Sequence, residues 1–201
     1  MELRRALETR RMTRDFLDSP LEPTLLNDLV GLAARSPSAG KTQGWSLLVL
    51  QDDAKEQFWN LSLPTDKRDG FAWPGLLRAP VIALSFANPD AYVERYAEPD
   101  KQHTGLVAGV EKWPTPYWTV DASMATMALL LAAHDAGLGA LFFAVFNDPQ
   151  NIRRAFGVPE NLELIGAVAL GHPNSGSRSR PGVSAKRARS STDEIIHRNR
   201  W

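Results

Sequence analysis

The sequence predicts a single α+β domain in which a mostly antiparallel sheet is flanked by helices. Four short apolar runs, bounded by Gly, Pro or Asp, are too short for good helices and predict strands. Apolar residues at helical spacing between these runs predict several helices. No internal repeat or linker divides the 201 residues into two cores, so one domain spanning residues 1–201 is expected.

Capping residues and apolar stripes define the elements in order. Pro23 suits the first turn of the second helix, and Asp148-Pro149 supplies an N-cap followed by a first-turn proline. A long helix that ends at Gly137 is apolar almost all round, which predicts burial on every side and suggests a dimer interface. The predicted helices are 3–7, 23–33, 54–61, 119–136 and 149–156, and the predicted strands are 45–50, 81–86, 141–146 and 162–170.

Composition excludes several classes of protein. Lys plus Arg and Asp plus Glu both total 23, so no net charge attracts nucleic acid. The chain has no cysteine, which excludes disulfides, thiolate metal sites, iron–sulfur clusters and a cysteine nucleophile. The four histidines show no metal-ligand spacing, so no metal site is predicted. Any redox chemistry must therefore come from a bound cofactor.

The expected location is the cytoplasm. The first residues alternate charged and short apolar pieces, unlike the continuous apolar core of a secretory signal. The most apolar run, 122–133, is too short to cross a bilayer, so no membrane partner is expected.

Basic residues gather at two places far apart in the chain. Arg10, Arg11 and Arg14 lie at the exit of the first predicted helix, and guanidinium groups suit phosphate because they donate paired hydrogen bonds. The second cluster consists of Lys186, Arg187 and Arg189. Each cluster alone is typical of a solvated basic surface. Together they indicate a ligand that carries phosphate.

A loop of small residues, 36–45 (SPSAGKTQGW), connects a predicted helix to a predicted strand. Its small side chains allow backbone N–H groups to approach a ligand, and Ser38, Thr42 and Gln43 add neutral hydrogen-bonding groups. A plain connection between elements is the alternative interpretation.

Three stretches of the chain resemble the nitroreductase family of FMN-dependent oxidoreductases. Residues 10–16 (RRMTRDF) resemble the family's R-R-S-x-R-x-F pattern, and 37–45 (PSAGKTQGW) resemble its P-S-x-x-N-x-Q-P-W loop. The third stretch comprises 137–139 (GLG), 156–160 (FGVPE) and 169–173 (ALGHP), followed by a basic tail. The resemblance is loose between about 62 and 118.

This resemblance implies an intertwined homodimer with FMN sites at the interface and with NADH or NADPH as electron donor. Arg10 matches a position near the flavin phosphate, and Arg14 matches one near the pyrimidine edge. Arg187 and Arg189 match phosphate ligands of the tail, and 37–39 match a loop that the partner subunit donates. The residues expected at the cofactor are Arg10, Arg11, Met12, Arg14, Pro37, Ser38, Ala39, Lys41, Gln43, Phe143, Ala144, Arg187 and Arg189.

Three departures from the family pattern alter the expected site. Met12 replaces a serine that could bond the phosphate, Lys41 replaces an asparagine, and Gly44 replaces a proline. The loop is therefore more cationic and more flexible than the pattern. Lys41 is a candidate to replace the hydroxyl lost at Met12.

The expected activity is transfer of electrons from NAD(P)H to a small aromatic, quinone or nitro acceptor by a ping-pong mechanism. Flavin supplies the hydride chemistry, so the protein binds and orients it, with Arg14 stabilising developing charge. The segment 62–118 is expected to be variable and lid-like, and 174–201 to be an extended tail. The aromatic residues of the segment 62–118 are candidates for substrate stacking or for ordinary packing: Phe71, Trp73, Trp113, Tyr117 and Trp118.

Other functions receive less support. The alternatives are a protein that stores or sequesters flavin without catalysis, and a relative that consumes flavin or removes halogen. A Rossmann site is disfavoured because 137–139 ends a helix and position 142 is Phe. Residues 38–41 read S-x-x-K, but the partner motifs of serine acyl-transfer enzymes are missing.

Overall fold

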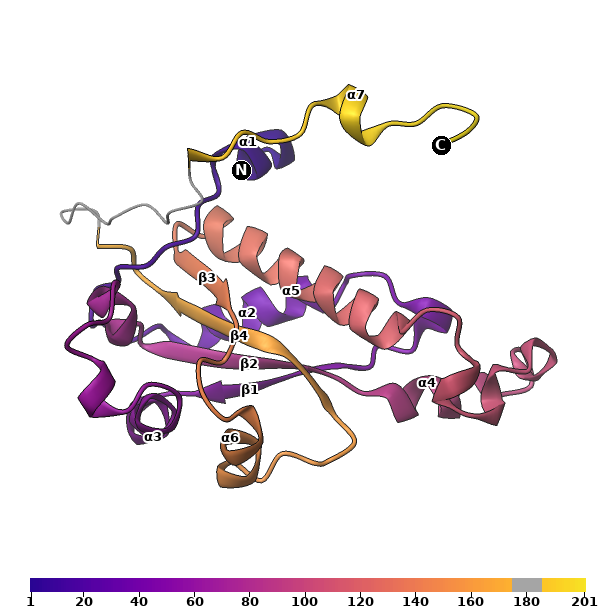
Figure 1. Cartoon of the computed structure of the whole chain (residues 1–201), viewed down its shortest axis with the longest axis horizontal. Helices are drawn as coiled ribbons and strands as arrows, with labels where there is room; N and C mark the ends of the chain where they lie inside the picture. Colours follow the sequence, from indigo (N-terminus) through magenta and orange to yellow (C-terminus); the bar gives the residue numbers. More distant parts are fainter. Residues whose placement is uncertain (175–185) are drawn as a thin grey trace.

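The computed structural model describes residues 1–174 and 186–201 and shows an antiparallel sheet between two layers of helices (Figure 1). The sheet order is β1-β2-β4-β3, and all three neighbouring pairs are antiparallel. The strands are β1 (Trp45–Leu50), β2 (Val81–Ala87), β3 (Gly139–Phe143) and β4 (Glu163–Gly171). The predicted α+β class and mostly antiparallel sheet are confirmed.

Helices cover both faces of this sheet. Helices α2 and α5 lie over one face, and α3 and α6 lie over the other (Figure 1). Their side chains pack into the two apolar cores on these faces. The α-helices are α1 (Leu3–Thr9), α2 (Pro23–Ala33), α3 (Asp52–Ser62), α4 (Pro89–Tyr96), α5 (Tyr117–Asp135), α6 (Pro149–Ala155) and α7 (Thr192–Ile195).

Strand β2 is the structural centre of the domain. All seven of its residues are buried, with Ile82 and Leu84 in the core beneath α3 and α6 and Val81 and Ala83 in the core beneath α2 and α5. This alternation follows from the two-residue period of a strand. Strand β2 lies inside the segment 62–118, whose variable and lid-like character stays a prediction.

The predicted strand 141–146 was wrong at both ends, because β3 runs from Gly139 to Phe143. A bulge in β4 explains the early end: Ser85 pairs with Gly166 while Phe86 pairs with Leu164. Gly166 adopts φ 157°, a conformation open mainly to glycine. The sheet bends there, and the chain beyond Phe143 leaves it.

Helix α4 was not among the predicted elements. The Asn88 side chain caps it by accepting a hydrogen bond from the Ala91 N–H at 3.3 Å, and Pro89 occupies the first helical position. This is the same cap and proline pair that correctly predicted α6, where the Asp148 side chain accepts from the Asn151 N–H.

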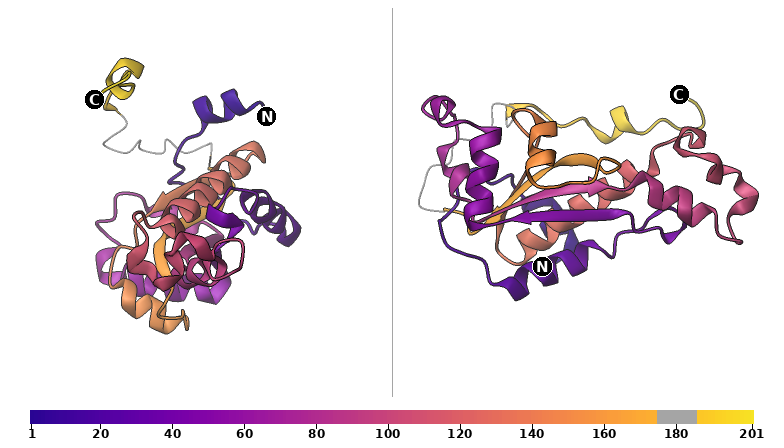
Figure 2. Two further views of the ribbon diagram at one scale, coloured as in Figure 1. Left: turned by 90° about the vertical axis from the view of Figure 1, so that its right-hand side faces the viewer. Right: turned by 90° about the horizontal axis from the view of Figure 1, so that it is seen from below.

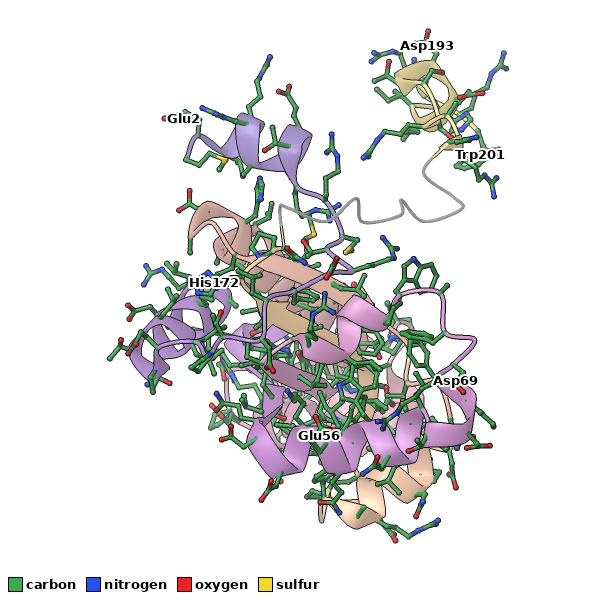
Figure 3. The ribbon with its side chains drawn as sticks, turned by 90° about the vertical axis from the view of Figure 1, so that its left-hand side faces the viewer. Glu2, Glu56, Asp69, His172, Asp193 and Trp201 are labelled. Carbon is green, nitrogen blue, oxygen red and sulfur yellow. The ribbon has the colours of Figure 1, made fainter. Side chains whose placement is uncertain are left out.

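The two ends of the chain project from the body. Helix α1 lies near the end of α5, where the hydroxyl of Thr9 and Nε2 of His134 are 2.8 Å apart. Residues 186–201 are exposed, and Figures 2 and 3 show α7, with Asp193 and Trp201, well apart from α1. Within the described residues, no helix has both the length and the apolar character needed to cross a membrane.

The segment that follows α1 is fixed to the sheet by backbone hydrogen bonds. The Thr13 N–H donates to the Ala140 carbonyl at 2.9 Å, and the Leu17 N–H donates to the His172 carbonyl at 2.9 Å. The Asn174 N–H donates to the Asp15 carbonyl at 3.0 Å. The arginine-rich segment therefore lies along β3, next to the point where the tail begins.

Candidate functional site

A cleft of about 360 Å³ lies between the arginine-rich segment, the end of α5 and β3. Two arginines, two threonines and a histidine contribute polar groups to a lining that is otherwise mostly apolar. The residues that line it are Met1, Thr9, Arg10, Arg11, Thr13, Leu130, His134, Gly137, Leu138, Ala140 and Pro173. Two predicted cofactor residues, Arg10 and Arg11, therefore share one cavity.

Arg10 lacks partners for two of its buried nitrogen atoms. Nε and Nη1 are both inaccessible to solvent and have no hydrogen-bond acceptor within the part of the chain that the structure describes. A buried polar group without a partner costs about 1–3 kcal/mol, and more when the group is charged. The arrangement is therefore suited to an anionic ligand that brings acceptor oxygens to Arg10.

Met12 packs into the protein and does not line this cleft. It forms an isolated bridge with Ala140 and contacts the apolar cores on both faces of the sheet. Thr13, which does line the cleft, lies so close to β3 that a Cβ atom at Gly139 would be 2.7 Å from its side chain. A hydroxyl is thus available one residue after the position where the family pattern has serine.

Arg14 is half-buried and lies over an aromatic ring. Its Nη1 donates to the Met12 carbonyl at 3.1 Å, and its guanidinium carbon lies 5.2 Å from the centre of the Trp73 ring. Cation–π contact of this kind holds a guanidinium in place while leaving its charge intact. Arg14 therefore presents a fixed positive charge beside an aromatic surface.

An aromatic cluster connects Arg14 to the end of β3. The ring centres of Phe71 and Trp73 are 6.0 Å apart, those of Phe71 and Phe146 are 5.7 Å apart, and those of Phe143 and Phe146 are 5.3 Å apart. Phe146 remains 43 % exposed. Two predicted site positions, Arg14 and Phe143, thus lie at opposite ends of one aromatic surface.

Ala144, the residue after this strand, lines a second cleft of about 680 Å³. The bulge residue Gly166 lines the same cleft, as do Val145 and Arg153. Nη2 of Arg153 donates to the carbonyls of Pro159 and Glu160, so this guanidinium is already engaged.

The 36–44 loop borders a groove of about 490 Å³ and has an unusual backbone. Gly40, Lys41 and Gln43 adopt positive φ angles of 61°, 56° and 58°. Non-glycine residues rarely adopt this conformation, and it costs on the order of 1–3 kcal/mol at each. Predicted site residues Pro37, Ser38, Lys41 and Gln43 line the groove together.

Polar side chains of α5 and α4 hold the backbone of this loop through hydrogen bonds. The Asp121 carboxylate accepts hydrogen bonds from the Ala39 N–H at 2.8 Å and from the Tyr92 hydroxyl at 2.7 Å. Nε of Arg95 donates to the Gly40 carbonyl at 2.8 Å. Burial, and then the bond to Asp121, raises the pKa of Tyr92 well above its usual range, so its hydroxyl remains a donor.

The model of the nitroreductase family matches residues 7–172, which is most of the chain. The chain belongs to the nitroreductase family. An Archaeoglobus fulgidus protein, provisionally named NADH dehydrogenase/NAD(P)H nitroreductase, is 26% identical over 175 residues, 86% of each chain. An iodotyrosine deiodinase of Nematostella vectensis is 24% identical over 191 residues, covering 86% of this chain and 67% of the relative.

Solved structures of nitroreductase-family proteins share the fold. One from Exiguobacterium sibiricum, a complex with FMN, has a TM-score of 0.75 and 16% identity, with 98% of this chain and 97% of that chain covered. One from Streptococcus pneumoniae has a TM-score of 0.75 and 18% identity, with 98% and 99% covered. The predicted family and the oxidoreductase class are confirmed.

In this nitroreductase-family chain the predicted cofactor residues do not all meet. Lys41 lines the groove of the 36–44 loop and not the cleft at Arg10, so its proposed replacement of a serine is not seen within one chain. Arg187 and Arg189 are exposed and line no part of that cleft. Their convergence with Arg10 on one phosphate stays a prediction.

Sequence reasoning missed four residues that contact or line the candidate site. Thr13 and His134 line the arginine cleft, and Asp121 and Tyr92 support the loop. The sequence carried a signal for the role of Asp121, because it is a carboxylate within a mostly apolar helix. A buried carboxylate must find hydrogen-bond donors elsewhere in the protein. Its partner Ala39, however, is 82 positions away in the sequence.

Proposed function

We propose that this protein is an FMN-dependent NAD(P)H oxidoreductase that reduces a small aromatic, quinone or nitro acceptor by a ping-pong mechanism. The observation that carries the proposal is Arg10, whose Nε and Nη1 are buried without a partner in the described part of the cleft. A phosphate supplies the oxygens that these two nitrogen atoms lack. The names of relatives support FMN and a reduced nicotinamide as the reactants.

The residues present fit an FMN molecule. Arg10 and Arg11 would bind its phosphate together with the hydroxyl of Thr13, and the tail residues Arg187 and Arg189 are candidates to add to them. When bound, FMN supplies the hydride chemistry that protein side chains lack. Arg14 would hold a positive charge at the pyrimidine edge, where negative charge develops during reduction.

The aromatic cluster beside Arg14 would exclude water from this part of the site. Phe71, Phe143 and Phe146 present apolar surface between Arg14 and the end of β3. Exclusion of water strengthens the electrostatic effect of Arg14. Their partly exposed rings also suit a flat acceptor, because aromatic surfaces stack.

We also propose a homodimer in which the partner subunit donates the 36–44 loop. Val120, Met124 and Met127 form a partly exposed apolar stripe on α5, between 37 and 39 % exposed. Leu3 and Leu7 of α1 are still more exposed. Apolar surface of this kind on neighbouring helices is typical of a subunit interface.

The visible spectrum of the purified protein tests the proposal. A yellow protein with bound FMN is expected, and anaerobic NADH or NADPH should bleach it, after which a quinone should restore the colour. Retained colour without bleaching by either nicotinamide would instead support flavin storage. Iodide release from an iodinated phenol, in place of quinone reduction, would support the dehalogenating alternative. A colourless protein that takes up no FMN would contradict all three.

A further inference from the structure

The 36–44 loop keeps its strained backbone only because other elements hold it. Three of its residues have positive φ angles, and two of these, Lys41 and Gln43, are not glycine. Strain of this kind persists where the surroundings determine the conformation, and it is concentrated at ligand-binding sites. The residues that hold the loop therefore shape the groove that it borders.

Asp121 is the buried support of the loop. It is 5% exposed, and both of the partners that the structure shows for its carboxylate are neutral donors, the Ala39 N–H and the Tyr92 hydroxyl. Burial of a carboxylate without a cation is costly, so stability alone gives little reason for it. Its effect is to fix Ala39, and with it the turn between Ser38 and Gly40.

Helix α4 also holds the 36–44 loop through a hydrogen bond. Arg95 holds the Gly40 carbonyl and is itself fixed by paired hydrogen bonds of 2.8 Å to both carboxylate oxygens of Asp100. A Cβ atom at Gly44 would lie 2.7 Å from Cε2 of the buried Tyr92 ring. The glycine that replaces the family's proline is therefore required by Tyr92, and loop and helix fit as one unit.

The supported loop presents the neutral groups of Ser38 and Gln43 to its groove, and the cations Lys41 and Arg35 line the same groove. Oγ of Ser38 accepts from the Gln43 N–H at 2.9 Å, which leaves the hydroxyl proton of Ser38 able to donate to a ligand. Neutral donors suit the ribityl hydroxyls and ring carbonyls of a flavin, whereas guanidinium groups suit its phosphate.

We propose that Asp121 is a positioning residue that, with Tyr92, holds the 36–44 loop in the shape that binds the uncharged part of the flavin. This inference rests on the proposed function and extends it to a pair of residues that do not touch the cofactor. Because Asp121 lies on α5 beside Val120 of the apolar stripe, the same helix would link the subunit interface to the loop.

Comparison of FMN with riboflavin, which lacks the phosphate, tests the inference by quenching of flavin fluorescence. In Asp121→Asn a neutral amide faces the Ala39 N–H and the Tyr92 hydroxyl in place of the carboxylate. Loss of a hydrogen bond to a charged group corresponds to about a 10-fold to 100-fold rise in Kd. The same factor is expected for FMN and for riboflavin. Tyr92→Phe keeps the ring against Gly44 and removes only the hydroxyl, so a rise of roughly 3-fold to 10-fold is expected for both flavins.

A matched control is Glu94→Gln, an exposed carboxylate on α4, which should leave both Kd values unchanged. Urea unfolding of each variant establishes that it is folded under the assay conditions, where a loss of stability alone does not alter Kd. If Asp121→Asn does not fold, Tyr92→Phe decides the question.

Unchanged riboflavin affinity in the folded variants would overturn the inference, and so would a loss confined to FMN. In either case a wild-type protein that binds FMN and is bleached by NAD(P)H would leave the proposed function intact. A wild-type protein that binds neither flavin would instead contradict the proposed function, and the inference with it.

Discussion

Replacement of Arg10 by methionine is expected to stabilise the FMN-free protein and to weaken FMN binding. Nε and Nη1 of Arg10 are buried without a partner among the described residues, and methionine fills similar space without polar atoms. Removal of the unsatisfied groups should raise the free energy of unfolding by about 1–3 kcal/mol. Loss of charge-assisted hydrogen bonds to phosphate should raise the Kd for FMN about 10-fold to 100-fold.

Two measurements check this pair of effects. Urea unfolding of FMN-free protein gives the change in stability, and fluorescence titration gives the Kd values for FMN and riboflavin, of which only that for FMN should rise. Arg4→Met is the control, because Arg4 is exposed on α1 and does not line the cleft at Arg10. A destabilised Arg10→Met protein with unaltered FMN affinity would refute the assignment of Arg10 to the phosphate.

Further substitutions test other parts of the structure. Gly139→Ala should lower the free energy of unfolding in urea by about 1–3 kcal/mol, because its Cβ would overlap the arginine-rich segment. Gly31→Ala, in α2 with open space around it, should raise the same quantity by roughly 0.5–1 kcal/mol. The bond to Arg95 lowers the pKa of Asp100 to about 2, below its unfolded value, so the pair stabilises the fold above about pH 4. The thermal midpoint of the wild type should therefore exceed that of Asp100→Asn at pH 6, and the difference should shrink as the pH falls below 4 and be lost below about pH 2. Met124→Glu should convert dimer to monomer in analytical ultracentrifugation, and an unchanged sedimentation coefficient would argue against the stripe as the interface.

Local sequence signals predicted most of the fold. The apolar runs that became β1, β2 and β4 were located to within about a residue at most ends, because strand length and flanking turn residues are local properties. The end of β3 was not predictable in this way, since it depends on a bulge at Gly166 in the neighbouring strand. Helix α4 was missed although Asn88-Pro89 carried a usable signal.

The candidate site was predictable only where one short segment contains it. The clustered arginines predicted a phosphate site, because guanidinium groups at close spacing indicate phosphate chemistry, and two of them line one cleft. The ligand of that cleft stays a prediction. The support of the 36–44 loop depends on contacts between Asp121, Tyr92 and Ala39, which only the folded chain brings together. Likewise the packing of Met12, which releases Thr13 to the cleft, follows from its position beside β3.

The hydrogen bond from Asn174 to Asp15 fixes the origin of the tail next to the arginine-rich segment. Arg187 and Arg189 belong to the same chain as this segment, so their contribution to anion affinity is insensitive to dilution if they serve their own chain. If they serve the opposite subunit, that contribution disappears when dilution separates the subunits.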